Sequence, residues 1–323
     1  MRDSEIFQQV HHWLSQSQPV WLCTVLSTWG SAPRPPGSLL ACTNNGDFIG
    51  SLSGGCVEED LLQRIAANEF PQSVSRVRYG AAPEEAERLR LPCGGILDVA
   101  IDYLAVTPEN LTVTAAVSSA LENRKRIRLT RNFVEGTRVT CADVSGVAGL
   151  SFRENAAGEL QAIDQLIGPP YRLLLIGSSE VSRAVAQMAL LLDYEVLLCD
   201  PREEACARWD IPAVTVLAQM PDDAVRLFGN DPSCAILALT HDPRIDDMGL
   251  MEAFNTRAFY IGAMGSLRTS QKRRERLLML DVTAEQLQRL HAPIGLDTGS
   301  KTPAEIAVSV LAELTAVRAG KRL

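Results

Sequence analysis

Long apolar runs are missing from this sequence of 323 residues. None approaches the roughly 18 residues that a membrane-spanning helix requires. The first residues, MRDSEIFQQVHHWLSQSQ, are polar and amphipathic, and they lack the apolar segment of a signal peptide. We therefore predict a protein that stays in the cytoplasm and does not associate with a membrane.

The sequence also lacks paired cysteines and a surplus of basic residues. Its eight cysteines are scattered without a C-x-x-C pair, so we expect free thiols and no structural zinc site. The net charge of -8 disfavours non-specific binding to nucleic acid or anionic lipid, and we expect no nucleic-acid role. Apolar residues, by contrast, make up 46% of the chain, which is ample to fill the cores of two domains.

The first part of the chain mixes helices with short strands. Apolar periodicity predicts helices over residues 5–16, 56–70 and 113–123. Strands are predicted over 20–26, 73–79 and 96–104, with weaker ones at 126–130, 137–142 and 150–153. The segments 39–43 and 48–52 flank the turn NNGD, which is typical of a β-hairpin.

Gly168-Pro169-Pro170 is the best candidate for a domain boundary, because prolines cannot continue a helix or a central strand. We therefore predict domains over 1–167 and 168–323. In the second domain, near-continuous apolar strands alternate with helices, a pattern typical of a parallel sheet that is covered on both faces. The predicted strands are 172–177, 195–200, 213–217, 234–240 and 258–263, and the predicted helices are 181–192 and 222–228. The predicted fold class is α/β, with a Rossmann-like, doubly wound second domain.

The first strand-to-helix turn of this second domain reads GSSEVS, where a dinucleotide-binding turn would read G-x-G-x-x-G. Gly177 fits that pattern, and Asp200 lies where an acid that binds a ribose would lie. Ser179 and Ser182 replace the other two glycines, and Glu180 adds negative charge at a helix N-terminus. The turn is either a nucleotide site or a simple connection between strand and helix.

Three further loops lie where ligands of such sheets bind, beyond the carboxyl ends of the strands: 239–244, 260–270 and 292–306. In the second loop, Gly262 and Gly265 follow a strand and precede a basic helix. A phosphate group would fit there, although such a helix is also typical of a solvated face. His241 and His291 are candidate ligands or bases, or else ordinary hydrogen-bonding residues.

Two thiols in the first domain lie beside glycine pairs. Cys56 follows Gly54-Gly55 and Cys93 precedes Gly94-Gly95, so bulky groups can approach both closely. A helix that starts at Cys56 favours its thiolate as a nucleophile or soft-metal ligand, an effect that Glu58 and Glu59 oppose. The other cysteines are predicted to be small buried residues: Cys23, Cys42, Cys141, Cys199, Cys206 and Cys234.

The loop STWGSAPRPPGS, residues 27–38, offers a different kind of contact. Ser31, Arg34 and Gly37 provide a hydroxyl, a guanidinium group and accessible backbone. These groups suit a phosphate-like ligand better than a soft metal.

Six segments of the chain together resemble one known family. They are GSAPRPPGSLL, GSLSGGCVEEDLL, PCGG, LTHDPRIDD, FYIGAMGS and HAPIGLDTGSKTPAEIAVSVLAEL. In this order they resemble the XdhC/CoxI family of accessory proteins for molybdenum hydroxylases, over nearly the whole chain. The resemblance implies a chaperone that binds the molybdopterin form of the molybdenum cofactor. It would shield the cofactor while a cysteine desulfurase partner helps to install a sulfido ligand, and then deliver it to an apo molybdenum hydroxylase such as xanthine or aldehyde dehydrogenase.

The resemblance also implies a site. Cys56 would lie beside the cofactor as a soft ligand or sulfur relay with Cys93 as its neighbour, so both are predicted as catalytic residues and metal ligands. The predicted cofactor-binding residues are Arg34, Gly54, Gly55, Gly94, Gly177, Asp200, His241, Gly262, Gly265 and Ser266. The chain departs from the family at 177–181, where GSSEV replaces a sequence like GAGHV, so binding of a nucleotide there stays open.

Other functions also stay open. The main alternative is an NAD(P)-dependent oxidoreductase that uses the Rossmann-like domain. A metal-binding or interaction module without a cofactor is another, and a Cys-His hydrolase would require Cys56 and His241 to lie close together. A homodimer is compatible with all of these functions.

Overall fold

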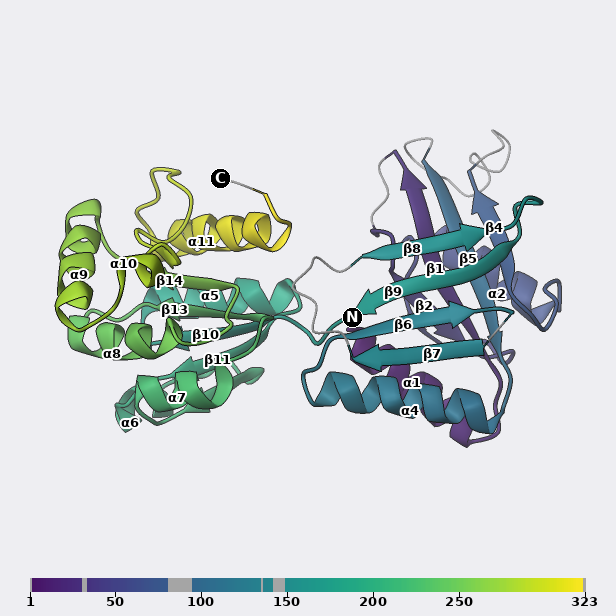
Figure 1. Ribbon diagram of the computed structural model, residues 1–323, viewed down its shortest axis with the longest axis horizontal. Coiled ribbons are helices and arrows are strands. Elements are labelled where there is room, and N and C mark those ends of the chain that lie inside the picture. Colours follow the sequence, from purple (N-terminus) through teal and green to yellow (C-terminus); the bar gives the residue numbers. More distant parts are fainter. Residues whose placement is uncertain (1, 31–33, 81–94, 135, 142–148, 322–323) are drawn as a thin grey trace. The chain divides into compact units, whose positions relative to one another are not determined.

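A computed structural model describes residues 2–30, 34–80, 95–134, 136–141 and 149–321. The chain divides into two compact units, Met1–Pro169 and Pro170–Leu323 (Figure 1). The division lies inside the Gly168-Pro169-Pro170 segment. None of the helices in the described ranges has the length and apolar character needed to span a bilayer.

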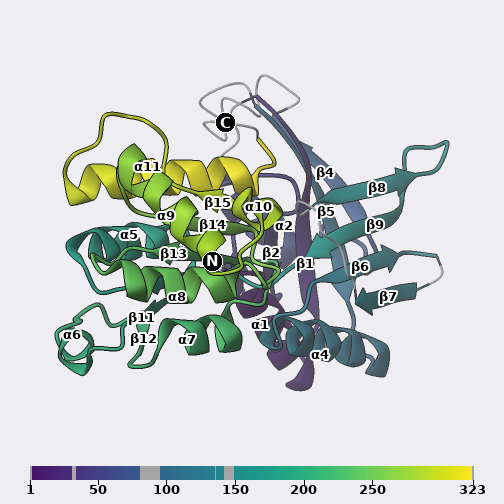
Figure 2. The same ribbon diagram turned by 60° about the vertical axis from the view of Figure 1, so that its left-hand side comes forward.

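Unit 1 contains two antiparallel sheets. The five-stranded sheet has the order β3-β2-β1-β5-β4, and the four-stranded sheet has the order β7-β6-β9-β8 (Figure 2). The strands of the first sheet are β1 (Val20–Trp29), β2 (Leu39–Cys42), β3 (Phe48–Gly50), β4 (Ser75–Tyr79) and β5 (Ile96–Leu104). Those of the second are β6 (Ile127–Asn132), β7 (Gly136–Cys141), β8 (Leu150–Glu154) and β9 (Leu160–Ile167). The helices are α1 (Asp3–Ser15), α2 (Cys56–Ala66) and α4 (Pro108–Glu122).

Strand β1 shows why the five-stranded sheet is buried on both faces. Cys23 and Val25 pack in one cluster with Val57 and Leu61 of α2. Leu22 points to the opposite face and packs with residues of α1, α4 and the second sheet. This alternation follows from the two-residue period of a strand.

Two elements of unit 1 differ from the predictions. The segment before the boundary reads as polar, yet it forms β9, in the interior of the second sheet. One of its polar residues, Asp164, binds Arg128 at 2.9 Å on the neighbouring strand β6. Helix α4 begins at Pro108 rather than at 113, because Thr107 caps it by accepting a hydrogen bond from Asn110 N at 3.2 Å.

Unit 2 contains one parallel sheet with the strand order β12-β11-β10-β13-β14-β15. This is the Rossmann order 3-2-1-4-5-6. The strands are β10 (Arg172–Ile176), β11 (Glu195–Cys199), β12 (Val214–Leu217), β13 (Cys234–Ala238), β14 (Tyr260–Ala263) and β15 (Leu290–His291). The helices are α5 (Glu180–Leu191), α6 (Glu203–Ala207), α7 (Pro221–Phe228), α8 (Pro243–Ala253), α9 (Leu267–Met279), α10 (Ala284–Leu287) and α11 (Pro303–Arg318). The predicted α/β, doubly wound fold class is confirmed.

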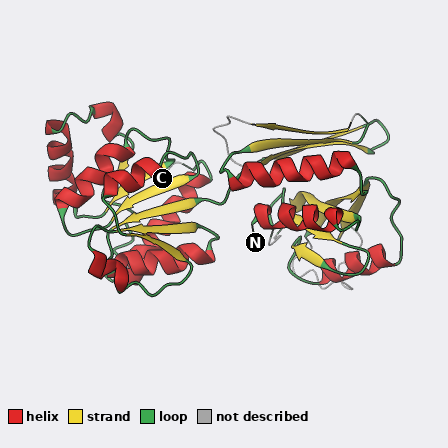
Figure 3. Cartoon of the chain, turned by 90° about the horizontal axis from the view of Figure 1, so that it is seen from below, coloured by secondary structure: helices red, strands yellow, loops and turns green. Residues whose placement is uncertain are grey.

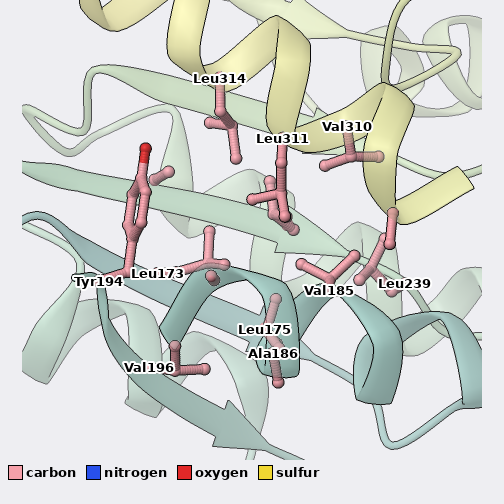
Figure 4. Close-up of a cluster of buried hydrophobic side chains, with 14 of the residues drawn as sticks. Leu173, Leu175, Val185, Ala186, Tyr194, Val196, Leu239, Val310, Leu311 and Leu314 are labelled. Atoms are coloured by element: carbon pink, nitrogen blue, oxygen red, sulfur yellow. The ribbon is translucent and has the colours of Figure 1, made fainter. Parts of the chain in front are cut away.

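Helices cover both faces of this sheet (Figure 3). Leu173 and Leu175 of β10 pack with Leu311 and Leu314 of α11 and with residues of α5 (Figure 4). The alternate residues Leu174 and Ile176 pack in a second cluster with side chains of α7, α8 and α9. Near-continuous apolar strands are therefore explained by burial on both sides.

Helix α8 was not predicted, because its inward face carries charged residues. Asp246 and Asp247 are buried on it and break the apolar periodicity. Arg273 of α9 binds Asp246 at 2.6 Å, and Arg276 binds Asp247 at 2.8 Å. The two helices are thus joined by ion pairs to buried carboxylates, which a hydrophobic pattern does not reveal.

Candidate functional site

In unit 1, the strand ends that flank the predicted site segments lie toward one edge of the five-stranded sheet. Trp29, at the end of β1, pairs with Ile96 at the start of β5. The start of β2 and the end of β3 lie toward the same edge, because Leu39 pairs with Thr24 of β1, and Leu40 with Gly50. Gly30 after β1, the loop before α2 and Gly95 before β5 therefore all lie toward this edge.

The described part of this edge contains Arg34, which is half-buried, and Gly37, which has φ +92. Gly37 O accepts a hydrogen bond from Gln165 Nε2 at 2.9 Å, so this backbone is tied to β9. Ser31, Cys93 and Gly94 lie outside the described residues. The predicted proximity of Cys93 to Cys56 therefore stays a prediction.

Cys56 is exposed and is the first residue of α2. The loop before it contains Gly54, with φ +87, a conformation that favours glycine. A Cβ atom added to Gly54 or Gly55 would meet no atom of the described residues within 4 Å. The thiol is therefore accessible, and the space beside the glycine pair is open.

Glu58, in the first turn of α2, binds back to this loop. Its carboxylate accepts hydrogen bonds from the N–H groups of Leu52, Ser53, Gly54 and Gly55 and from the hydroxyls of Ser51 and Ser53, at 2.6–2.9 Å. Burial by itself would raise the pKa of Glu58, but these hydrogen bonds outweigh it and lower the pKa to about 2. Glu58 was predicted to oppose the effect of the helix dipole at Cys56. Its hydrogen bonds show that it also holds the loop of residues 51–55 against the start of α2.

Most of the remaining cysteines have the expected environment. Cys23, Cys42, Cys199 and Cys234 are buried. Cys206 of α6 is only partly buried, and its Sγ lies 3.3 Å from Asp200 O. Within the described residues, no group of three or more His, Cys, Asp or Glu side chains is arranged to hold a metal ion.

In unit 2, a pocket of about 1160 Å³ lies at the carboxyl ends of β10, β11 and β13. It is placed where the strand order reverses, between β10 and β13, as expected for ligand sites in open α/β sheets. Among its lining residues are Ser178, Ser179, Glu180, Asp200, Arg202, Thr240, His241, Arg244 and Lys301. The structure thus brings together the predicted residues Asp200 and His241 beside the Gly177 turn.

Asp200 is already fully engaged in this pocket. Its carboxylate accepts hydrogen bonds from Ser178 N at 2.8 Å and from three nitrogens of Arg202 at 2.7–3.0 Å. Although burial by itself would raise the pKa of Asp200, these hydrogen bonds hold it below the usual value. Little acceptor capacity is left for the hydroxyls of a ribose.

Arg202 and Arg244 were missed, although the sequence contains a signal for both. Asp-Pro-Arg occurs at 200–202 and at 242–244, after β11 and after β13. Arg244 repeats the geometry of Arg202, since its backbone N, Nε and Nη2 donate to Asp242 at 2.8–3.1 Å. The two guanidinium groups are 66% and 87% exposed and line one pocket. Lys301, also missed, adds a third cation.

The Gly177 turn accommodates its serines through hydrogen bonds. Ser179 caps α5 by accepting from Ser182 N at 3.1 Å. The buried hydroxyl of Ser182 donates to Gly177 O at 2.5 Å, so it fits where a dinucleotide-binding turn has glycine. Gly177 itself has φ +98, and a Cβ atom there would clash with Thr240. Close packing of two strand ends therefore requires this glycine.

The second glycine loop has contacts of its own. A Cβ atom at Gly262 would lie 2.5 Å from Ile294 Cδ1, so packing alone requires glycine there. Gly265 lines a smaller pocket of about 500 Å³, and Ser266 caps α9 by accepting from Thr269 N at 3.2 Å. Of the basic residues on α9, Arg273 is buried against Asp246.

His291 is held by a buried carboxylate. Its Nδ1 lies 2.6 Å from Glu313 of α11, which also accepts from Tyr260 OH at 2.5 Å and from Gly295 N at 2.6 Å. The His291 and Tyr260 rings stack with centroids 4.2 Å apart. These contacts tie β14 and β15 to α11, which is the ordinary hydrogen-bonding role considered for this histidine.

Comparison with known proteins gives matches in both units. A family model described as the XdhC Rossmann domain matches residues 173–314, and one described as the XdhC and CoxI family matches residues 13–80. The chain is 27% identical over 320 residues to a Bacillus subtilis protein named as a probable xanthine dehydrogenase subunit, covering 94% of this chain and 95% of that protein. It is 26% identical over 301 residues to "Molybdenum cofactor insertion chaperone PaoD" of Escherichia coli, covering 92% of this chain and 83% of that protein.

The fold also has a solved counterpart. A crystal structure titled as a xanthine dehydrogenase from Bacillus halodurans superposes with a TM-score of 0.74 at 22% sequence identity, covering 100% of this chain and 97% of that one. Both units are therefore found together in a known structure. With the two family models matched in chain order, the chain belongs to the XdhC and CoxI family.

Proposed function

We propose that this protein is an accessory chaperone that binds the molybdopterin form of the molybdenum cofactor as cargo. It supports sulfuration of the cargo, for which a cysteine desulfurase supplies the sulfur, and passes it to an apo molybdenum hydroxylase such as xanthine or aldehyde dehydrogenase. The similarity to a protein named a molybdenum cofactor insertion chaperone supports this role. The cytoplasm stays its predicted location.

The exposed thiol of Cys56 is the observation that carries the proposal. Thiolates suit soft transition metals and sulfur chemistry, and a thiol beside an open glycine pair can be approached by a bulky group. Such a residue has no evident structural task, because its side chain is not part of the core. Cys56 would contact the metal end of the cargo.

The pocket of unit 2 suits a phosphate group. Arg202, Arg244 and Lys301 provide cationic donors for a phosphate group, and the hydroxyl of Ser178 adds to them. The volume of about 1160 Å³ is large enough for a small-molecule ligand, since such pockets usually measure about 300–1,000 Å³. We therefore assign phosphate recognition to this pocket.

An NAD(P)-dependent oxidoreductase is the second candidate, favoured by the Rossmann strand order. Two observations weigh against it. Asp200 is occupied by Arg202, and Glu180 places a carboxylate at the N-terminus of α5, where a pyrophosphate would bind.

The test is to purify the protein from cells that make molybdenum cofactor and to measure bound molybdenum and pterin together. We expect near-stoichiometric amounts of both, a loss of at least fivefold in Cys56→Ser with the fold intact, and no loss in the control Cys206→Ser. Protein without pterin that shows a thermal shift with NADH or NADPH would instead favour the oxidoreductase. Protein that binds neither would favour an interaction module.

A further inference from the structure

Glu58 makes more contacts than the capping of α2 requires. Its side chain is buried, with 7% of the residue exposed, and it accepts six hydrogen bonds from residues 51–55. Four of these come from successive backbone N–H groups. A carboxylate has roughly four lone-pair sites, so no acceptor capacity remains for another partner.

Successive N–H groups that converge on one point are the geometry with which loops and helix N-termini bind oxyanions. At α2, a carboxylate of the helix itself occupies that point. An anion that approached this helix end would meet the charge of Glu58 and no free N–H group of residues 52–55.

The thiol of Cys56 lies at the same helix end. Gly55, whose N–H donates to Glu58 at 2.9 Å, directly precedes it. The thiol nevertheless remains exposed, with open space beside Gly54 and Gly55. The turn is thus fixed on one side by Glu58 and accessible on the other.

We propose that Glu58 is a positioning and specificity-determining residue for Cys56. It holds the turn 51–55 in one conformation, and by filling the ring of N–H groups it keeps oxyanions away from the thiol. The thiol is then offered to a soft, weakly charged group. This inference rests on the proposed function in one respect, because the cargo would meet Cys56 with its metal centre and bind its phosphate elsewhere.

The experiment compares two alkylating reagents that attack the same sulfur and differ in charge, neutral iodoacetamide and anionic iodoacetate. Rates at Cys56 are measured by peptide mass spectrometry on the full-length protein. In Glu58→Gln, we expect the ratio of the iodoacetate rate to the iodoacetamide rate to rise at least fivefold. Glu59→Gln removes the same charge from the next, exposed residue and should change the ratio less than twofold.

A merely structural role for Glu58 predicts a different result. Loosening of the turn would change both rates together and leave their ratio unchanged, which would overturn the specificity role. Cys206, the partly buried thiol of unit 2, serves as an internal reference, and its ratio should be the same in all variants. Hydrogen exchange at the amides of residues 52–55 should accelerate in Glu58→Gln and not in Glu59→Gln.

A second measurement uses the unaltered protein, in case Glu58→Gln does not fold. Inorganic phosphate at 20 mM, about the scale of weak anion sites, should leave the iodoacetamide rate at Cys56 unchanged relative to chloride of equal ionic strength. Slowing by phosphate would mean that the N–H groups are open to anions and would refute the proposal. Neither measurement requires the cofactor. Failure of the role proposed for Glu58 is therefore distinguishable from failure of the proposed function.

Discussion

Each unit of this protein contains a buried carboxylate that binds a glycine-containing turn. Glu58 of unit 1 takes all its donors from the loop before its own helix and leaves its negative charge unpaired by any cation among those donors. Asp200 of unit 2 takes one donor from the Gly177 turn and three from Arg202. The same chemical group therefore produces two different surroundings.

The difference lies in what each carboxylate leaves for a ligand. In unit 1, Glu58 already accepts from the N–H groups of residues 52–55, so these groups are not available to an anion. In unit 2, the charge of Asp200 is neutralised, and two exposed guanidinium groups with Lys301 face a pocket. The described groups of unit 1 therefore suit a soft group, and those of unit 2 suit a phosphate.

The largest expected effect is the destabilisation of unit 2 by Gly177→Ala. The new methyl group would clash with Thr240, and the alanine would have to adopt φ +98, which favours glycine. We therefore expect a loss of about 2–5 kcal/mol in the stability of unit 2. Gly54→Ala is the matched control in unit 1: its φ of +87 is similar but its surroundings are open, so about 1 kcal/mol is expected. Hydrogen exchange in β10 and β13 measures the stability loss in Gly177→Ala, and exchange in the strands of unit 1 measures that in Gly54→Ala. Equal losses of stability in the two variants would contradict the role of packing at Gly177.

Acid should destabilise unit 1 through protonation of Glu58. Its pKa of about 2 in the folded protein lies below the ordinary 4.5, so its contribution of about 3 kcal/mol is complete above pH 4.5 and is lost as the pH falls toward 2. The difference in unfolding free energy between the unaltered protein and Glu58→Gln should therefore shrink over that range. Urea unfolding followed by tryptophan fluorescence reports mainly on unit 1, which holds Trp13, Trp21 and Trp29 of the four tryptophans. A difference that stays constant with pH would refute this assignment.

Arg202→Ala should weaken anion binding in the pocket of unit 2. It removes a guanidinium group from the pocket and leaves Asp200 unneutralised, so affinity for inorganic phosphate should fall about tenfold, or about 1.4 kcal/mol. Arg208→Ala is the matched control, because Arg208 is 82% exposed and is not among the residues that line the pocket. Calorimetric titration measures both, and equal losses would indicate long-range charge in place of a contact.

Prediction from sequence succeeded where one physical signal dominates. The strands of unit 2 are apolar throughout because both faces are buried, and the β2-β3 hairpin follows from the turn NNGD. It failed where polar residues of one element pair with residues of a neighbouring strand or helix. Strand β9, with Asp164 bound to Arg128, and helix α8, with Asp246 and Asp247 bound to α9, both look like surface segments in the sequence.

The candidate site shows the same limit. Cys56 could be singled out because glycines and a helix start flank it in the chain. Arg202, Arg244 and Lys301 lie up to about a hundred positions apart in sequence, and only the parallel sheet brings them to one pocket.

The sequence by itself determined the two-domain α/β architecture, the family and the accessible thiol, because each depends on local pattern or on motifs in order. The tertiary structure decided which charges remain available to a ligand. Glu58 follows a glycine turn in the sequence, whereas Asp200 lies at the end of β11, far along the chain from the Gly177 turn. The effects of both depend on which N–H groups and which guanidinium group reach each carboxylate in space. Those contacts are set by the packing of loops and helices, which no pattern within either segment specifies.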